Sequence, residues 1–132
     1  LLVDMPPGTS DVPLTVMQML PLDGVIVVTS PQDMARSVVK KAYHMANQLQ
    51  VPVLGLVENM SYVTCPHCGE KFSVFGQKPL SEAAQEFNVQ VCAEIPLDPQ
   101  LAQLTDKGDI EHIGENITLT LHSMVQALAS MP

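Results

Sequence analysis

The chain has 132 residues with a net charge of -8, and 46% of them are hydrophobic, which suits a single globular domain. The excess of acid argues against a nucleic-acid partner, because binding to a phosphate backbone needs clustered cations. Every apolar run is interrupted well before the roughly 18 residues that span a bilayer, so we expect no membrane partner.

The first five residues, Leu1 to Met5, form an apolar run that is broken by one acid, and no initiator Met precedes them. This pattern is typical of the end of a buried strand. We therefore expect the sequence to be a fragment whose upstream part is missing. The next segment, Pro6-Pro7-Gly8-Thr9-Ser10-Asp11, predicts a loop in which Asp11 caps a helix over Val12 to Leu20.

The middle of the chain alternates between strand and helix patterns. The β-branched run Val25 to Val28 predicts a parallel strand covered on both faces. Ser30 and Pro31 predict the N-cap and first residue of a helix that continues to Leu49. A second strand is expected over Val51 to Val57.

A cysteine-containing stretch, Met60 to Pro79, interrupts this alternation and predicts a small hairpin insertion. Beyond it the spacing predicts a helix, a strand, a short helix and a terminal helix, over Leu80 to Phe87, Val89 to Ile95, Pro99 to Leu104 and Ile113 to Leu128. Strands that alternate with helices imply an α/β fold with a mainly parallel sheet.

Asp4 and Gly8 are candidate catalytic residues. A carboxylate at the carboxyl end of a buried strand is well placed for a phosphate-bound Mg²⁺, and a glycine in the next turn lets a backbone amide approach a γ-phosphate. An equally good reading of these residues alone is a tight turn before a capped helix.

Cys65 and Cys68 are candidate metal ligands in the run Cys65-Pro66-His67-Cys68, which fits a reducing cytoplasm better than a disulfide framework. Two thiolates make half of a tetrahedral site, and both Zn²⁺ and a [4Fe-4S] cluster normally need four ligands. Cys92 lies in an apolar strand and is expected to belong to the hydrophobic core. The side chain of His67 is expected to point away from the metal. A homodimer would supply the missing pair.

The cysteine pair has two other interpretations: a purely structural zinc knuckle, and a thioredoxin-like redox pair. The redox interpretation is the weaker one, because the pair does not directly follow a strand at the start of a helix. The sequence leaves the identity of the metal open, since Zn²⁺ accepts the same thiolates as a cluster.

Asn59 and the Pro96-Leu97-Asp98 loop each follow a predicted strand, so they fall at the carboxyl edge of the sheet, where nucleotides bind. From the residues alone, Asn59 is better read as a turn-former and Asp98 as the N-cap of the next helix.

Several motifs resemble those of the Mrp/ApbC/NBP-type P-loop ATPases, in the same order. Asp4 to Asp11 is similar to the switch II segment D-x-P-P-G-T-G-D, with Ser10 in place of a Gly. Further matches, which extend the resemblance to about Gly108, are Thr29-Ser30-Pro31-Gln32-Asp33, Val57-Glu58-Asn59-Met60-Ser61, the cysteine run, and Ile95-Pro96-Leu97-Asp98-Pro99. The family's P-loop motif is absent, which fits its upstream position, and Gln77-Lys78-Pro79-Leu80 replaces a glycine-rich stretch.

The resemblance implies that residues 1–132 are the part of a deviant P-loop NTPase domain from switch II onward, with 60–79 as an insertion. It implies a cytoplasmic, ATP-hydrolysing carrier that holds a [4Fe-4S] cluster across a homodimer and passes it to apo iron-sulfur proteins. Asn59, Pro96, Leu97 and Asp98 would then line the adenine pocket.

Without the P-loop, this chain alone is expected to be inactive as an ATPase. A rival interpretation is a MinD/ParA-like positioning ATPase whose cysteines hold a structural zinc clip between subunits. A third is a dimerisation unit without enzymatic activity.

Overall fold

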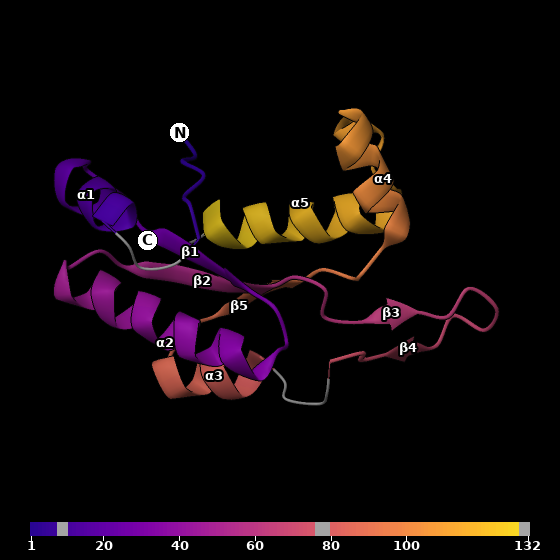
Figure 1. Ribbon diagram of the computed structural model, residues 1–132, viewed down its shortest axis with the longest axis horizontal. Coiled ribbons are helices and arrows are strands. Elements are labelled where there is room, and N and C mark those ends of the chain that lie inside the picture. The colour runs from indigo at the N-terminus through magenta and orange to yellow at the C-terminus, as the bar shows by residue number, and fades with distance from the viewer. Residues whose placement is uncertain (8–10, 76–79, 130–132) are drawn as a thin grey trace.

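The structure, a computed structural model, describes residues 1–7, 11–75 and 80–129 (Figure 1). The main elements in chain order are α1 (Asp11–Met19), β1 (Val25–Thr29), α2 (Asp33–Gln48), β2 (Val53–Glu58), β3 (Val63–Thr64), β4 (Lys71–Phe72), α3 (Leu80–Phe87), β5 (Val91–Glu94), α4 (Pro99–Lys107) and α5 (Glu115–Ala129). A 3-10 turn, η1 (Ile110–His112), separates α4 from α5.

Three parallel strands form the central sheet in the order β1-β2-β5. Val28 of β1 pairs with Val57 of β2, and Leu56 of β2 pairs with Val91 of β5. Helices α2 and α3 cover one face of the sheet, while α5 lies along the other (Figure 1). The predicted α/β fold, a parallel sheet flanked by helices, is confirmed.

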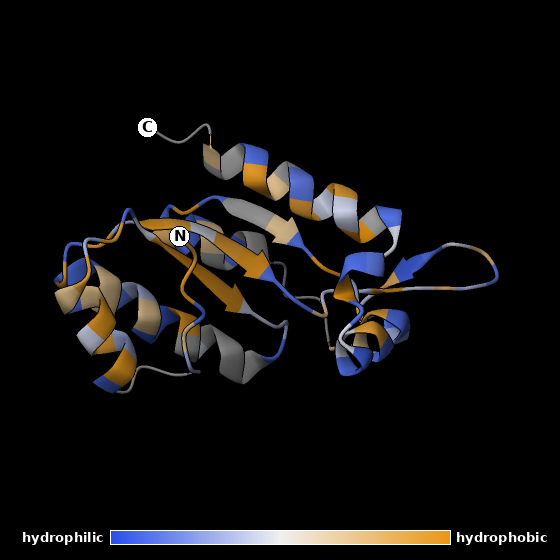
Figure 2. Cartoon of the chain, turned by 90° about the horizontal axis from the view of Figure 1, so that it is seen from above, coloured by the Kyte–Doolittle hydropathy of each residue, from blue (hydrophilic) through white to orange (hydrophobic). Residues whose placement is uncertain are grey.

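The core lies between the sheet and the α2–α3 layer, where Val39, Leu56, Ala84 and Phe87 are buried. The ring of Tyr43 in α2 packs on Phe87 of α3 with ring centroids 4.7 Å apart. Strands β1 and β2 are coloured mainly as hydrophobic in Figure 2. This agrees with their sequences, since a parallel strand between two helical layers has little contact with water.

The first residues do not form the strand that the sequence predicts. Leu1 to Pro6 have no regular secondary structure, and Leu1 and Leu2 are exposed. A strand forms only when its backbone pairs with a neighbour, and no described strand pairs with this segment. The prediction of a buried strand over Leu1 to Met5 is therefore wrong for this structure.

Strand β1 is less covered than its sequence predicts. Val28 is 64% exposed. Because β1 pairs with β2 alone, it stands at an edge of the described sheet, where a helical layer does not reach every side chain.

The start of α2 also differs from the prediction. The N-cap is Gln32, with extended backbone, and neither Ser30 nor a side-chain cap begins this helix. The helix begins at Asp33, so Ser30 and Pro31 both lie in the loop before it.

Downstream, helix α3 matches its predicted bounds. Helix α4 is longer than predicted and ends at Gly108, whose left-handed backbone closes the helix. None of the helices among the described residues is long and apolar enough to cross a membrane.

Candidate metal and nucleotide sites

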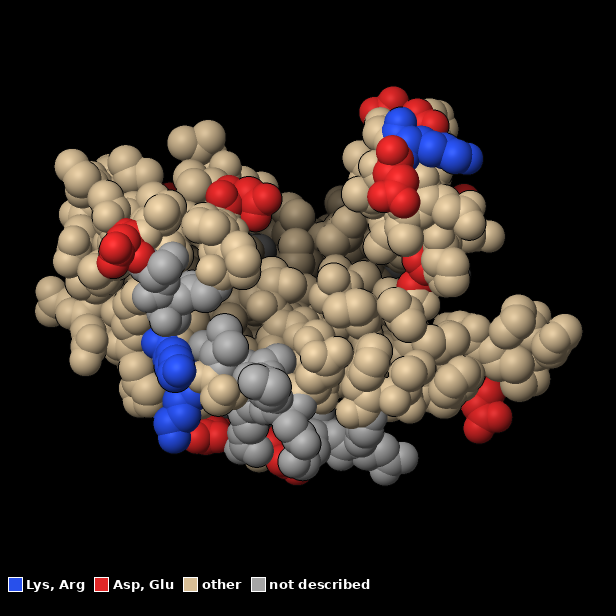
Figure 3. Space-filling model, viewed as in Figure 1, with Lys and Arg blue, Asp and Glu red and all other residues tan. Residues whose placement is uncertain are grey.

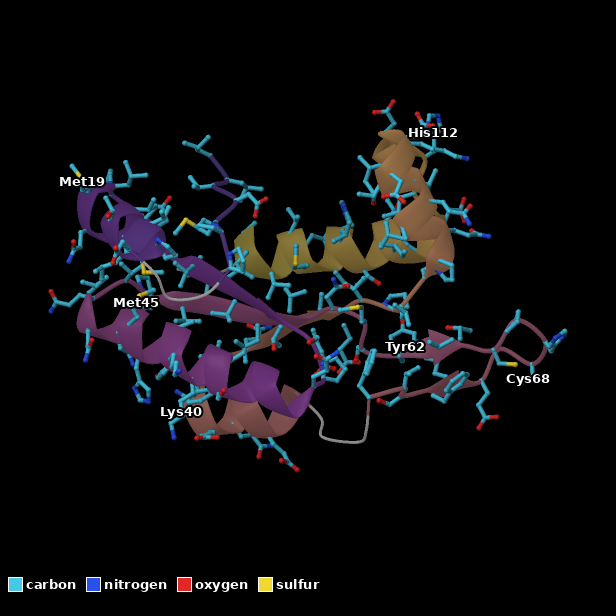
Figure 4. All side chains as sticks on the ribbon, in the orientation of Figure 1. Met19, Lys40, Met45, Tyr62, Cys68 and His112 are labelled. Carbon is cyan, nitrogen blue, oxygen red and sulfur yellow. The ribbon has the colours of Figure 1, made fainter. Side chains whose placement is uncertain are left out.

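The cysteines lie on a β-hairpin that projects from the body of the molecule, as predicted (Figure 1). Its strands β3 and β4 are antiparallel and form a separate two-stranded sheet, in which Val63 pairs with Phe72 and Thr64 with Lys71. Cys68 lies near the tip of the hairpin, and Tyr62 lies at its root (Figure 4). The cysteines are thus held away from the central sheet.

A tight turn at the tip joins the two cysteines. The amide of Cys65 donates to the carbonyl of Glu70 over 2.9 Å, and the amide of Gly69 donates to the carbonyl of Cys65 over 2.9 Å. Gly69 has φ +73°, a left-handed conformation that glycine adopts without steric cost. Both cysteines have free thiols, with Cys65 half-buried and Cys68 exposed.

The turn also activates Cys65. Its pKa is lowered below the ordinary value for a thiol, first by a hydrogen bond from the backbone of Cys68, then by one from the backbone of His67 and one from the Cys68 side chain. Loss of hydration opposes this shift of the pKa. Because the thiolate is the form that binds metals, this turn favours metal capture.

The cysteine pair does not complete a metal site within the described residues. Nowhere in the described ranges do three or more His, Cys, Asp or Glu side chains gather in a way that could hold a metal ion. The backbone of Cys92 lies in β5, but its side chain is outside the described part. The two thiolates therefore stand as half of the usual four-ligand set.

The root of the hairpin is anchored by a buried carboxylate. Glu58 is 5% exposed, and its Oε2 accepts a hydrogen bond from the hydroxyl of Ser61 over 2.6 Å. Between these residues Met60 adopts a left-handed φ of +58°, which turns the chain out of β2. Neither Glu58 nor Ser61 was predicted as a functional residue, although a lone acid at the end of an apolar run is a signal for a partnered buried carboxylate.

Backbone hydrogen bonds then join this root to the chain that follows β5. Ile95 donates to the carbonyl of Glu58 over 2.8 Å, and Ser61 donates to the carbonyl of Ile95 over 2.9 Å. Leu97 donates to the carbonyl of Tyr62 over 2.8 Å. The loop proposed for nucleotide and the hairpin that carries the cysteines are thus directly bonded.

The four predicted nucleotide-site residues, Asn59, Pro96, Leu97 and Asp98, lie at one edge of the sheet. Asn59 follows β2, and Pro96, Leu97 and Asp98 follow the neighbouring strand β5. The side chains of Asn59 and Asp98 also make local contacts: Asn59 Oδ1 accepts from the amide of Met60, and Asp98 Oδ1 caps α4 by accepting from the amide of Gln100 over 2.8 Å. The turn-forming and capping readings of these residues are thus seen in the structure.

Of the two predicted catalytic residues, Asp4 is exposed on the irregular first segment, so its expected position at a strand end is not observed. Gly8 lies outside the described residues. The catalytic roles of both residues remain predictions.

Comparison with known proteins identifies relatives. The family model ParA, described as NUBPL iron-transfer P-loop NTPase, matches residues 1–130. An iron-sulfur cluster carrier protein from Aquifex aeolicus is 38% identical over 134 residues, covering 99% of this chain and 37% of that protein. The iron-sulfur cluster transfer protein NUBPL from Dictyostelium discoideum is 40% identical, covering 82% of this chain and 33% of that protein.

The solved structures include a similar fold. The nucleotide-binding protein from Archaeoglobus fulgidus, in complex with ADP and with cobalt, is 45% identical and has a TM-score of 0.72. The match covers 82% of this chain and 44% of that one, so the chain spans less than half the length of these relatives. The resemblance to Mrp/ApbC/NBP-type ATPases is confirmed, and the chain belongs to the ParA family of NUBPL iron-transfer P-loop NTPases.

Proposed function

We propose that the protein containing this chain is an ATP-dependent carrier that binds a [4Fe-4S] cluster across a homodimer and transfers it to apo iron-sulfur proteins. The observation that carries the proposal is the pair of free thiols, half-buried Cys65 and exposed Cys68, on a projecting hairpin, which supplies half of a four-thiolate set. Relatives named as iron-sulfur cluster carriers support it.

The exposure of Cys68 suits a cargo site. A purely structural metal is usually enclosed by its ligands, whereas a cluster that is handed to another protein must be reached by that protein's thiolates. A two-fold axis through the cluster turns the pair into a full set of four cysteines. The same donors accept Zn²⁺, which we expect as a competitor in protein purified in air.

The nucleotide would bind at the carboxyl edge of the sheet, with Asn59, Pro96, Leu97 and Asp98 on the side of the adenine. Support comes from their common position after neighbouring strands and from the ADP complex of the similar structure. Asp4 and Gly8 would face the phosphates. One carboxylate suits Mg²⁺, which is commonly held by one or two carboxylates, waters and the nucleotide's own phosphates.

In this proposal, residues 1–132 are part of one P-loop NTPase domain from switch II onward, and 60–79 are an insertion in it. The chain contains no lysine-bearing P-loop motif. We therefore expect the 132-residue chain alone to bind ATP weakly and to hydrolyse none, because the phosphate cradle is missing. The free thiols of Cys65 and Cys68 suit a reducing compartment such as the cytoplasm.

The test is anaerobic reconstitution with iron and sulfide, followed by visible absorbance and by metal content per chain. Wild-type protein should hold one cluster per two chains. Cys65→Ser and Cys68→Ser should each abolish it, since either change removes two of the four thiolates. Cys92→Ser is the matched control and should keep the cluster.

Two outcomes would contradict the proposal. Loss of iron from the Cys92→Ser variant, with iron retained by the Cys65→Ser and Cys68→Ser variants, would place the site elsewhere. Binding of Zn²⁺ alone, with no cluster formed under anaerobic conditions, would favour a zinc-clipped positioning ATPase.

A further inference from the structure

The hairpin has two chemically different faces. Side chains alternate between the faces of a strand, so a directly opposed pair shares one face. Val63 and Phe72 are opposed and share one face, and Thr64 and Lys71 share the other. The hydrogen bond from Cys65 to Glu70 continues the same register, which puts Cys65 on the face of Val63 and Phe72.

The other face is covered from within the chain. Lys71 Nζ lies 4.3 Å from the centroid of the Tyr62 ring, within the range of a cation-π contact. Tyr62 belongs to that face because it lies two residues before Thr64. The long lysine stem therefore covers the tyrosine ring, and this face presents a charge to solvent.

The cysteine-bearing face presents an exposed aromatic ring instead. Phe72 is 51% exposed although it lies on a regular strand. Beyond it, Val74 and Phe75 are also exposed, at 50% and 38%. The projecting hairpin shows mostly uncharged side chains in Figure 3. Exposed apolar side chains on the face that carries a metal-binding cysteine mark a candidate interaction surface.

We propose that Phe72, with Val63 opposite it, forms a docking surface for the same hairpin of a second copy of this chain. The inference rests on the proposed function, because the shared cluster is what brings the second copy to Cys65. The described residues supply two thiolates and no third ligand, so the site is incomplete without that copy. Phe72 lies on the face that this copy must approach.

The surface has a chemical consequence for the cargo. In a two-fold arrangement each copy presents the same patch, so the two Phe72 rings flank the shared site from opposite sides. They exclude water from the thiolates and add apolar contact to the metal bonds. Dimerisation therefore depends on Phe72 as well as on the cysteines.

The first test replaces Phe72 with Ser and measures the dissociation constant of the cluster-loaded dimer by sedimentation velocity. The matched control is Ile110→Ser, because Ile110 is also a half-exposed apolar residue, at 47%, but lies on η1 and outside the hairpin. We expect dimerisation to weaken by tenfold or more for Phe72→Ser and to stay within twofold for Ile110→Ser.

A second test does not depend on comparing stabilities. Phe72→Glu and Phe72→Lys should each dimerise poorly, because two like charges meet near the axis. Mixing the two variants should give heterodimers in preference to either homodimer, since opposite charges then face each other. Mass spectrometry of the mixed, cluster-loaded sample measures the proportions.

The outcomes separate this inference from the function on which it rests. A wild-type protein without one cluster per two chains refutes the shared site itself. A wild-type dimer of the expected stoichiometry whose dissociation constant is unchanged by Phe72→Ser, or variants that mix at random, overturns the docking surface alone. A Phe72→Ser dimer of normal stability that transfers its cluster slowly to an apoprotein also overturns it, because the patch would then belong to the client.

Discussion

The amide of Leu97 donates to the carbonyl of Tyr62 over 2.8 Å, which ties the loop after β5 to the root of the cysteine hairpin. Leu97→Pro removes this donor while leaving the carbonyl in place. We expect faster hydrogen exchange for the amides of Cys65 and Gly69, because the hairpin loses an anchor to the central sheet. Leu97→Ala keeps the amide and is the control. Equal exchange in the two variants would mean that the bond does not restrain the hairpin.

Ser61 is expected to stabilise the turn between β2 and the hairpin. Ser61→Ala removes the hydroxyl that donates to the buried Glu58 carboxylate. Loss of a hydrogen bond to a buried charged group should lower the free energy of unfolding by about 1–3 kcal/mol. Urea denaturation measures the change. Ser61→Thr retains a hydroxyl and should recover most of the loss, and a Thr variant as unstable as the Ala variant would contradict the assignment.

Gly69 is expected to be required for the geometry of the cysteine turn. A Cβ at this position meets open space, but the left-handed backbone would cost an alanine about 1–2 kcal/mol. Gly69→Ala should therefore weaken metal binding by about tenfold, as measured by competition with a chelator of known affinity. Gly114→Ala is the matched control, since that position also has open space and lacks a positive φ. Equal affinities for the two variants would count against this role.

Cys65 should react at lower pH in the folded protein than in the unfolded chain. Hydrogen bonds from the Cys68 and His67 backbone lower the pKa of Cys65, so its thiolate persists to lower pH in the fold. Alkylation of metal-free protein by iodoacetamide, followed site by site with peptide mass spectrometry, should show a titration midpoint below that of the same cysteine in urea. Coincident midpoints would show that the turn does not activate this thiol.

Local patterns in the sequence were enough to predict most of the secondary structure. The β-branched run of β1, the apolar spacing of α3 and the Asp98-Pro99 start of α4 each depend on residues within a few positions of one another. The cysteine hairpin was predicted for the same reason, because the pair, Gly69 and the flanking apolar residues are neighbours in the chain. The family motifs are short and local as well.

What only the tertiary structure decided depends on residues that are distant in the chain. Val28 is exposed and Leu1 to Met5 form no strand, because burial and strand pairing depend on neighbouring strands and helices. A short apolar run does not specify those neighbours. The bond between Tyr62 and Leu97 exists because parallel strands β2 and β5 end at the same edge. The exposure of Phe72 beside Cys65 follows from the hairpin register, since a shift of one residue would have put that ring on the opposite face.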